Sequence, residues 1–277
     1  MTWVCPRRRN NMGAQLPPTE SHNGVAAVDR ALAILAALEG ASEPLTLAKL
    51  ARTTGFYKST ILRLIGSLGD AGYAMRLRDG CYSLGASAFR LGLAYERQNP
   101  LRRHALPILE RLVANGTESA SLHVVHGPHT RLCLFRVNSR HSTLDSVDAG
   151  DVLPIERGAA GRVLLAYSDG TSAQHTALRR AGYTLSKGER DPNCAGLAAP
   201  VFGPTGEIVA ALSLSGPGER FTSDAIARMR KLLLKAAEQL TQLLGGTAPA
   251  KIQPRTSSRS VSTTRRSSVA IAERGAG

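Results

Sequence analysis

Apolar residues recur at helical spacing in the N-terminal third of the chain. The first such stretch predicts a helix from Val25 to Glu39, which Gly40 ends. A second, shorter helix is predicted after Thr46, a favourable N-cap residue, and it ends at Gly55. The residues expected on the buried stripe of the first helix are Val28, Ala31, Leu32, Leu35 and Leu38.

A third helix follows, with apolar residues at the i, i+3, i+4 and i+7 positions of one face. Those residues are Ile61, Leu64, Ile65 and Leu68. The same spacing turns a different set outward, namely Ser59, Leu62, Arg63 and Gly66. No acidic residue occurs on the outward face before Asp70. Two short helices separated by a tight turn predict a helix-turn-helix.

The chain then turns back on itself in a predicted hairpin. Strands are expected from Tyr73 to Leu77 and from Cys81 to Leu84. They are joined at Asp79-Gly80, a dipeptide that favours a two-residue type I′ turn. Arg76 and Arg78 are two positions apart, so we expect them to share one face of the first strand.

Together these elements predict a winged helix-turn-helix over residues 24–85, which points to double-stranded DNA as a partner. In that fold the second helix of the motif lies in the major groove, where Arg63 is placed to read a guanine edge. The alternative is a pair of packed helices whose polar side is only solvated. The residues expected to contact phosphates or bases are Thr46, Lys58, Ser59, Thr60, Arg63, Arg76 and Arg78.

Beyond the hairpin the pattern becomes mixed helix and strand. A linker helix is predicted over residues 86–99. The fold class expected is therefore α+β and multidomain, with a mixed α/β domain over residues 100–245. Its predicted elements are a helix with Leu106, Leu109, Leu112 and Val113 on its face, a hairpin of Ser121–Val125 and Leu132–Val137, helices Gly161–Tyr167 and His175–Ala181, strands Leu197–Phe202 and Ile208–Leu214, and a long helix from Thr222 to Gly245.

The net charge of the chain suggests a class of partner, but little of that charge lies in the predicted DNA-binding domain. The chain has 277 residues and a formal net charge of +14, which favours a polyanionic partner. Residues 1–23 and 246–277 lack apolar periodicity and are expected to be disordered basic tails. Residues 25–85 hold seven Lys/Arg against five Asp/Glu, a net of only +2. Recognition of DNA must therefore depend on the placement of basic side chains.

Two smaller questions concern the tails and the compartment. A supplementary phosphate grip by Arg259, Arg265 and Arg266 is a hypothesis, and the natural start at Met1 or Met12 stays open. The four cysteines show no metal-binding or CxxC spacing, so we expect reduced thiols and no metal or cofactor. We find no secretory segment and no apolar run that spans a bilayer, so we expect a cytoplasmic, nucleoid-associated protein with no membrane contact.

Catalysis is the weaker functional class. His123 and His126 face opposite sides of a strand, so a metal site with His129 requires the turn to fold back. Cys194 has no positioned histidine within its segment to activate it as a nucleophile. An enzyme is therefore not expected. A second alternative is an architectural DNA-binding protein without an effector, whose second domain would lack a cavity.

From Val25 to Gly245 the chain resembles the IclR-type bacterial transcriptional regulators. The resembling segments, in order, are VDRALAIL, LAKLARTTGFYKSTILRLIGSL, YSLG, LPIERGAAGRVLLA and LAAPVFGPTGEIVAALSLSGP. The resemblance implies a GAF-like C-terminal domain that binds a small effector and helps to form homodimers or homotetramers. It also implies a repressor or activator of a catabolic operon that senses a small organic or aromatic acid and binds a roughly palindromic operator.

The resemblance places the effector pocket around the start of the helix predicted at Gly161. The small residues Gly158–Gly161 let backbone N–H groups approach an anion, so we expect a carboxylate ligand, although they can equally serve close packing on the sheet. The chain departs from the family pattern at Tyr57, where proline is common, and at Ser186, where an acidic residue is frequent. The pocket residues implied are Leu153, Ala159, Ala160, Ser186, Glu189, Gly196 and Ser213.

Overall fold

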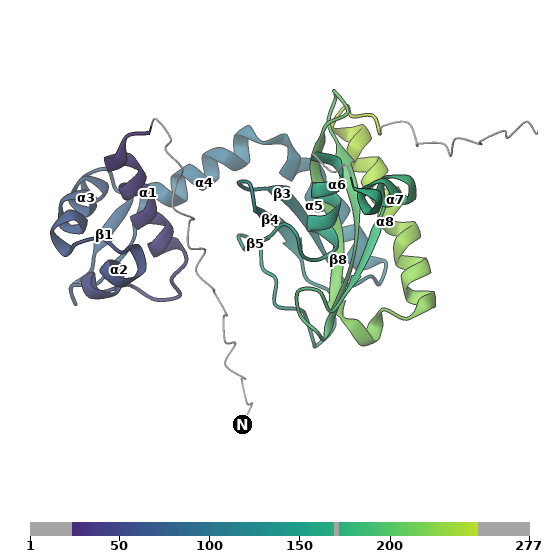
Figure 1. The fold of residues 1–277 in the computed structure, drawn as a ribbon, viewed down its shortest axis with the longest axis horizontal. Coiled ribbons are helices and arrows are strands. Elements are labelled where there is room, and N and C mark those ends of the chain that lie inside the picture. The colour runs from purple at the N-terminus through teal and green to yellow at the C-terminus, as the bar shows by residue number, and fades with distance from the viewer. Residues whose placement is uncertain (1–23, 169–171, 249–277) are drawn as a thin grey trace, which may run out of the picture.

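The computed structural model describes residues 24–168 and 172–248, which form two domains joined by a helix (Figure 1). That helix is α4 (Ala86–Gln98), with the helix-turn-helix domain before it and the mixed α/β domain after it. The expectations for residues 1–23, and for Arg259, Arg265 and Arg266, fall outside the described residues. Within the two described ranges, no helix is long and apolar enough to cross a bilayer.

Three helices and a hairpin pack around one apolar core in the N-terminal domain. Thr46 caps the second helix as predicted, because its Oγ1 accepts the Lys49 N–H at 3.2 Å, and Gly55 ends that helix with a φ of 72°. Backbone bonds between Leu45 and Tyr82 then fasten the start of this helix to the hairpin. The elements are α1 (Ala26–Glu39), α2 (Leu47–Thr54), α3 (Lys58–Asp70), β1 (Ala74–Arg76) and β2 (Tyr82–Leu84).

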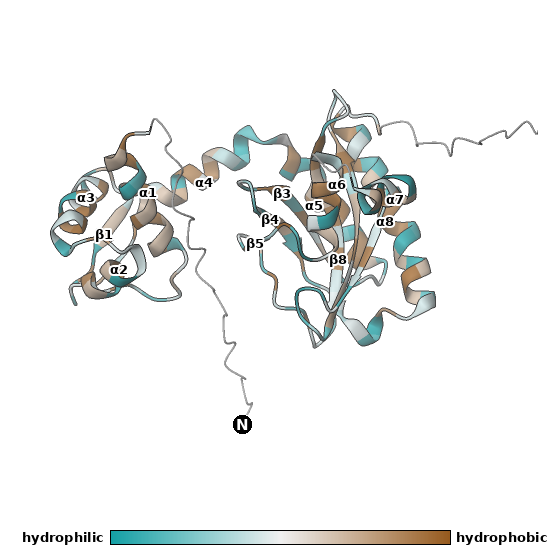
Figure 2. Cartoon of the chain, viewed as in Figure 1, coloured by the Kyte–Doolittle hydropathy of each residue, from teal (hydrophilic) through white to brown (hydrophobic). Residues whose placement is uncertain are grey.

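The predicted stripe of α1 is wrong in part. Val28 and Leu32 are 53% and 57% exposed, whereas Ile34 and Leu38 are buried in the core. The helix presents its Ile34–Leu38 side to α2 and α3, so the apolar residues one step around the helix stay uncovered. Most residues of α1 are apolar and only short stretches are hydrophilic (Figure 2), which is why its pattern could not indicate which side is buried.

The hairpin forms, but the predicted type I′ turn and the shared arginine face are wrong. Among the described residues only glycines have positive φ, so Asp79 cannot adopt the type I′ geometry, while Gly80 has a φ of 83°. The Leu77 N–H donates to the Cys81 carbonyl at 2.8 Å, which leaves a three-residue loop between them. Arg78 lies in that loop and Arg76 in β1, so they do not share a strand face.

The two domains are joined through a sharp change of helix direction. Asn99 ends α4, and its side chain caps the next helix, α5 (Pro100–Ala114), by accepting the Leu101 N–H at 3.0 Å. Proline at the first position of α5 suits a helix start, because its missing N–H has no partner there. No residue of α4 is buried. The linker helix is therefore largely solvated in a single copy of the chain.

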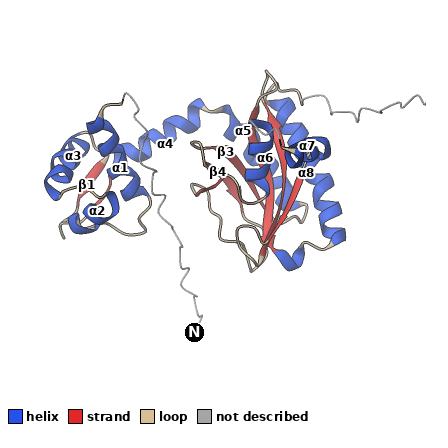
Figure 3. Cartoon of the chain, viewed as in Figure 1, coloured by secondary structure: helices blue, strands red, loops and turns tan. Residues whose placement is uncertain are grey.

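The C-terminal domain is built on one antiparallel sheet (Figure 3). The sheet has six strands in the order β5-β4-β3-β8-β7-β6. Its hairpins and helices match the predicted ones in type and order. The strands are β3 (Ser119–Val125), β4 (Thr130–Val137), β5 (Val152–Pro154), β6 (Thr184–Lys187), β7 (Cys194–Phe202) and β8 (Ile208–Pro217). The helices are α5, α6 (Ala159–Ser168), α7 (Ala173–Ala181) and α8 (Ser223–Leu243), with a short 3₁₀ turn, η1 (Gly218–Arg220).

Helices cover the sheet on both sides, and the two sides differ in chemistry. Leucines and valines of β3, β7 and β8 pack against α5 and α8 in the larger apolar core. On the opposite side, under α6, Ala198 and Ala211 belong to a smaller apolar core. Most of the other residues on that side are small or polar, namely Ser119, Ser121, His123, Arg131, Cys133, Arg136, Ser186, Gly196, Ser213 and Ser215. Buried polar groups need partners, so this side is where a polar ligand can be held.

Two edge strands, β5 and β6, were not predicted. β5 has only three residues and ends in proline, so it carries no alternation that a sequence pattern could detect. β6 pairs with β7 through Thr184–Lys187, a segment with a single apolar residue. Both strands exist because a neighbouring strand offers free backbone groups, which is a tertiary cause rather than a local one.

Candidate functional site

The outward face of α3 is as the sequence predicts. Ser59, Leu62, Arg63 and Gly66 are exposed, while Ile61 and Ile65 are buried against α1 and α2. The helix has no acidic residue in its first turn and none before its last residue, Asp70. Because this face carries the cationic side chain of Arg63 and no anionic side chain, it can approach a polyanion without repulsion.

The amino end of α3 is open. Tyr57 occupies the N-cap position, and no side chain of the described residues caps this end. The first N–H groups of the helix therefore remain available, beside the exposed Lys58. Free N–H groups at a positive helix end bind phosphate well. Tyr57 itself is 84% exposed, so its ring is not part of the apolar core of this domain.

The other predicted DNA-contacting residues lie in different local settings. The Thr46 hydroxyl oxygen accepts the hydrogen bond that caps α2, and its side chain is exposed on the surface. The Arg76 guanidinium lies over the Tyr82 ring at 6.0 Å from the centroid, so Tyr82 holds it against the wing. Arg78 projects from the loop at the tip of the hairpin. Thr60, in the first turn of α3, is half-buried.

A cavity lies between α6 and the polar side of the sheet in the C-terminal domain. Six of the seven residues assigned to an effector pocket line it: Ala159, Ala160, Ser186, Glu189, Gly196 and Ser213. The seventh, Leu153, lies in β5 opposite Arg131 and is not part of the lining. The sequence interpretation did not assign to this pocket several other polar residues that line it: His123, Arg131, Asp145, Arg190, Asp191, Cys194 and Ser215.

The amino end of α6 already carries an anion. Glu189 Oε2 accepts the Gly158 N–H at 3.0 Å, and its Oε1 pairs with Arg162 at 2.9 Å. The neighbouring small residues also serve packing, because a Cβ on Gly161 would lie 2.0 Å from the Ile155 carbonyl oxygen. Both interpretations of the small-residue run therefore apply in part. The N–H groups do attract a carboxylate, but it belongs to Glu189.

Asp145 anchors the far wall of the cavity. Its side chain is fully buried and pairs with Arg136, and at 3.4 Å with Arg190. Arg136 also donates to Ser121 Oγ at 3.1 Å and Asn138 Oδ1 at 2.7 Å, so its charge and its donors are both satisfied. Such a buried carboxylate held by two guanidinium groups fixes this wall in one arrangement.

Two buried polar side chains of the cavity remain incompletely bonded. His123 Nδ1 and Arg131 Nε have no hydrogen-bond partner among the described residues, although both side chains are more than nine-tenths buried. Burial, together with the charges of Arg131, Arg136 and Arg190, lowers the pKa of His123 well below its usual value, so it is neutral at pH 7. Burial and Arg190 lower the pKa of Arg131 to about 10, so it stays charged.

A β-bulge explains why sequence reasoning missed this cluster. Between Leu122 and His123 the partner residue on β4 changes from Phe135 to Cys133, so β4 contains one extra residue there. The bulge brings Arg131 and Arg136 to the same side of the sheet, although they are five positions apart. Strict alternation places them on opposite sides. The sequence did contain one signal of this cluster, because Arg136 is a charged residue inside the predicted strand Leu132–Val137.

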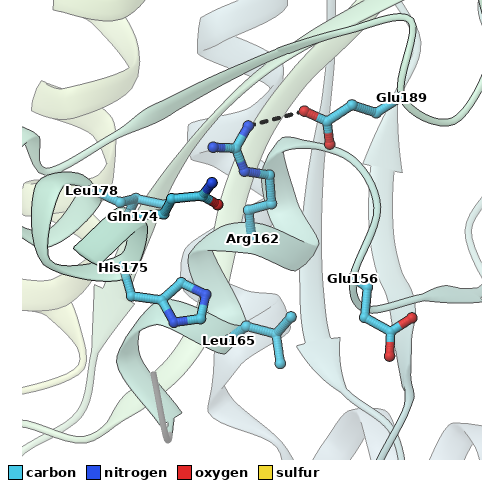
Figure 4. A pocket seen from close by; sticks show the side chains of 7 residues that line it. All are labelled: Glu156, Arg162, Leu165, Gln174, His175, Leu178 and Glu189. Carbon is cyan, nitrogen blue, oxygen red and sulfur yellow. Dashed lines mark hydrogen bonds and ion pairs between the residues drawn. The ribbon is translucent and has the colours of Figure 1, made fainter. Parts of the chain in front are cut away.

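A second, more open pocket of about 400 Å³ lies on the outer side of α6 (Figure 4). Figure 4 shows Arg162 reaching to Glu189, with which it pairs at 2.9 Å, and Glu189 lines both pockets. The other lining residues are Glu156, Leu165, Gln174, His175 and Leu178. Only Glu189, of the residues that sequence reasoning assigned to an effector site, lines this outer pocket. The inner cavity is therefore the better candidate.

The described residues also bear on the catalytic alternatives. They contain no group of three His, Cys, Asp or Glu side chains arranged to hold a metal. Burial, with the nearby charges of Asp191 and Asp145, raises the pKa of Cys194 to about 11, so its thiol is protonated at pH 7. A protonated thiol is a poor nucleophile.

Two family models match the chain. An IclR helix-turn-helix domain matches residues 27–78, and the model described as the bacterial transcriptional regulator IclR C-terminal domain matches residues 174–242. Among relatives, the HTH-type transcriptional regulator BhcR of Paracoccus denitrificans is 30% identical over 258 residues, which cover 84% of this chain and 91% of that one. The transcriptional repressor IclR of Escherichia coli is 26% identical over 249 residues, covering 80% and 91%.

Solved structures agree with the model in fold. An IclR transcriptional regulator from Silicibacter sp. has a TM-score of 0.71 and 25% identity, covering 81% of this chain and 98% of that one. An IclR homologue from Microbacterium hydrocarbonoxydans has a TM-score of 0.66 and 24% identity, covering 79% and 99%. Matches to both domains, in the same order and over most of each chain, show that this protein belongs to the IclR family of DNA-binding bacterial transcriptional regulators.

Proposed function

We propose that the protein binds a specific operator duplex by placing α3 in the major groove. The observation that supports this most is the α3 surface itself, where Arg63 is exposed on a face without acidic residues and the amino end is uncapped. Arg63 then reads a guanine edge, while Lys58, Ser59 and the free N–H groups bind a phosphate. Arg76 and Arg78 on the wing follow the adjacent backbone, and Thr46 and Thr60 lie beside this interface.

We further propose that a small organic or aromatic acid binds in the inner cavity and sets the affinity for DNA. The related Microbacterium protein was solved in complex with 4-hydroxybenzoate. The cavity of this chain holds about 50 Å³, below the ~300–1,000 Å³ typical of ligand pockets. Binding therefore requires the loop between β6 and β7, which carries Glu189, to move away from α6. A moving segment is what a ligand needs to shift a conformational equilibrium.

The proposed active form is a homodimer or homotetramer. Val25, Val28 and Leu32 lie at i, i+3 and i+7 spacing around the start of α1, and each is more than half exposed. On α4, Phe89 is 69% exposed and Leu91 is 60% exposed. Apolar rows on unburied helices are unfavourable in water unless another surface covers them. A second copy would cover them by two-fold symmetry and match the two halves of a palindromic operator.

Such a regulator acts on chromosomal DNA in the cytoplasm, and a catabolic operon is the target that best fits an organic-acid effector. Whether it represses or activates transcription depends on where the operator lies relative to the promoter. The competing proposal is an effector-independent architectural protein. The buried polar lining of the inner cavity favours the ligand-responsive regulator, because a purely structural core would exclude those groups.

Mapping the genomic binding sites of the full chain, followed by a thermal-unfolding screen of the metabolites handled by neighbouring genes, tests this function. We expect a few strong sites with a shared, roughly palindromic sequence, and a stabilising metabolite that is an organic acid. Evenly distributed sites without a shared sequence would favour the architectural protein. A control with Arg63→Ala should lose the shared sequence while its melting temperature is unchanged.

A further inference from the structure

The inner cavity contains one cation that the fold leaves without an anion. Arg190 pairs with Asp145, and Arg136 behind it pairs with the same carboxylate. Arg162, on the far side of α6, pairs with Glu189. Arg131 lines the cavity, is 3% exposed, and forms no ion pair among the described residues. A buried, uncompensated charge is costly, so a structural role alone does not account for it.

The guanidinium of Arg131 is only half used. Nη1 donates to the Pro154 carbonyl oxygen, and to that of Arg157 at 2.8 Å, which ties down the segment between β5 and α6. The Nε–H has no acceptor. Nη2 lies close to Gly158, where an added Cβ would be 3.5 Å away. A carboxylate that enters the cavity can therefore accept from Nε and Nη2 together, which is the bidentate geometry that arginine offers.

His123 supplies a second, uncharged contact in the same cavity. Its Nδ1 is unpartnered, and the surrounding charged groups are the guanidinium groups of Arg131 and Arg136 on β4 and Arg190 on the β6–β7 loop. The imidazole is therefore neutral and offers one hydrogen bond to a hydroxyl, carbonyl or carboxylate oxygen of a ligand. The neighbouring Asp191, whose Oδ1 accepts the Asn193 N–H, also lines the cavity but forms no ion pair with Arg131.

We infer that the effector is an organic anion whose carboxylate pairs with Arg131, with His123 hydrogen-bonded beside it, and that the amino end of α6 does not hold this carboxylate. This inference rests on the proposed function, since it assumes an effector in the inner cavity. It assigns recognition of the charge to β3 and β4, whereas Glu189 occupies the helix end at which a carboxylate is otherwise expected. The two cavity residues thus determine the chemical class of the ligand.

The test uses matched acids and amides, namely acetate with acetamide and benzoate with benzamide. Each is titrated into the full chain at constant ionic strength, and binding is measured by calorimetry and thermal unfolding. We expect both acids to bind the wild-type protein more tightly than their amides. Arg131→Gln should weaken acid binding by at least about tenfold and leave amide binding nearly unchanged, and Arg131→Lys should restore part of the preference.

Two further variants distinguish a failure of the Arg131 inference from a failure of the proposed effector pocket. Arg162→Gln removes a cation that lines only the outer pocket, and it should leave the acid preference intact. Ala160→Val narrows the inner cavity and should weaken acids and amides alike, with folding checked by circular dichroism. If acids bind Arg131→Gln as well as wild type while Ala160→Val blocks them, the inference fails and the effector pocket stands. If Ala160→Val has no effect on acid binding, the proposed pocket itself fails. Wild type that binds neither acid also overturns the inference.

Discussion

Arg63 is the residue on which we expect base recognition to depend. Its side chain is exposed on the outward face of α3, and it is the only cation of that helix beyond the first turn. Replacing it by alanine should reduce discrimination between the operator and an operator with the contacted base pair changed, by about 1–3 kcal/mol. Competition gel shifts measure this discrimination.

The matched control for this variant is Arg103→Ala, an exposed arginine on α5 in the other domain. It should leave operator discrimination at the wild-type value. Both variants should remain folded and oligomeric, because neither side chain is buried. Equal discrimination by Arg63→Ala and wild type would show that another side chain reads the operator.

His123 makes stability depend on pH. Its pKa lies well below the usual value in the folded protein, because of burial and nearby arginine charges, but returns to about 6.5 on unfolding. The unfolded chain therefore binds an extra proton below that pH, so the free energy of unfolding falls as the pH decreases. Below about pH 6.5 the loss from this residue is at most about 1.4 kcal/mol per pH unit, the limit set by one extra proton.

Urea unfolding of wild type and His123→Gln at several pH values isolates this contribution. The variant should lose most of the acid dependence of the C-terminal domain. His126→Gln, which replaces an exposed histidine just beyond β3, should keep it. An unchanged acid dependence in His123→Gln would contradict this account, because it would mean that His123 binds its proton equally well in the folded and unfolded chain.

The residues that sequence reasoning recovered are those whose role is local. The position of Arg63 follows from the period of α3, and the Thr46 cap follows from its place before a helix. Arg131 was missed because its role depends on the β4 bulge and on the loop before α6, two features set by contacts between distant segments. The family resemblance located the cavity but did not include its buried cation.

At the scale of elements, the main question is what covers the exposed apolar residues of α4. Its exposed apolar residues form two i, i+4 pairs on different sides of the helix, Phe89 with Leu93 and Leu91 with Tyr95, and no element of the described residues covers them. If a second copy packs there, Phe89→Ser with Leu93→Ser should lower the oligomeric mass measured by light scattering. Operator affinity should fall with it, because two half-sites are no longer bound together.

Arg90→Ser is the control for that double variant, since it changes an exposed polar residue on the same helix. It should leave the mass unchanged. An unchanged mass for the Phe89 and Leu93 double variant would assign the contact between copies to another surface.

The long, periodic elements are those that could be predicted, and the short ones are not. The long helix predicted from Thr222 to Gly245 matches α8 to within two residues at each end, because its signals rest on residues of the helix itself. The predicted turn of the β1–β2 hairpin was wrong, because Asp79-Gly80 suits both a two-residue and a three-residue loop. Only the pairing of Leu77 with Cys81 decides between them.

At the scale of the whole molecule, α3, which we propose reads DNA, and the inner cavity, which we propose binds an organic anion, lie in separate domains. The connection between them is α4 and its junction at Asn99. A ligand in the cavity affects DNA binding only if its affinity differs between the two arrangements of the domains. The coupling must then be reciprocal, so that operator DNA changes the affinity for the ligand by the same factor.

That reciprocity gives the most direct measurement. The full chain is titrated with its mapped operator, with and without a saturating acid that binds the inner cavity, and then with the acid, with and without operator. We predict that both affinities change by the same factor, between about 5-fold and 150-fold. Operator affinity that is identical with the cavity empty and filled would contradict the account of this protein as a ligand-responsive regulator.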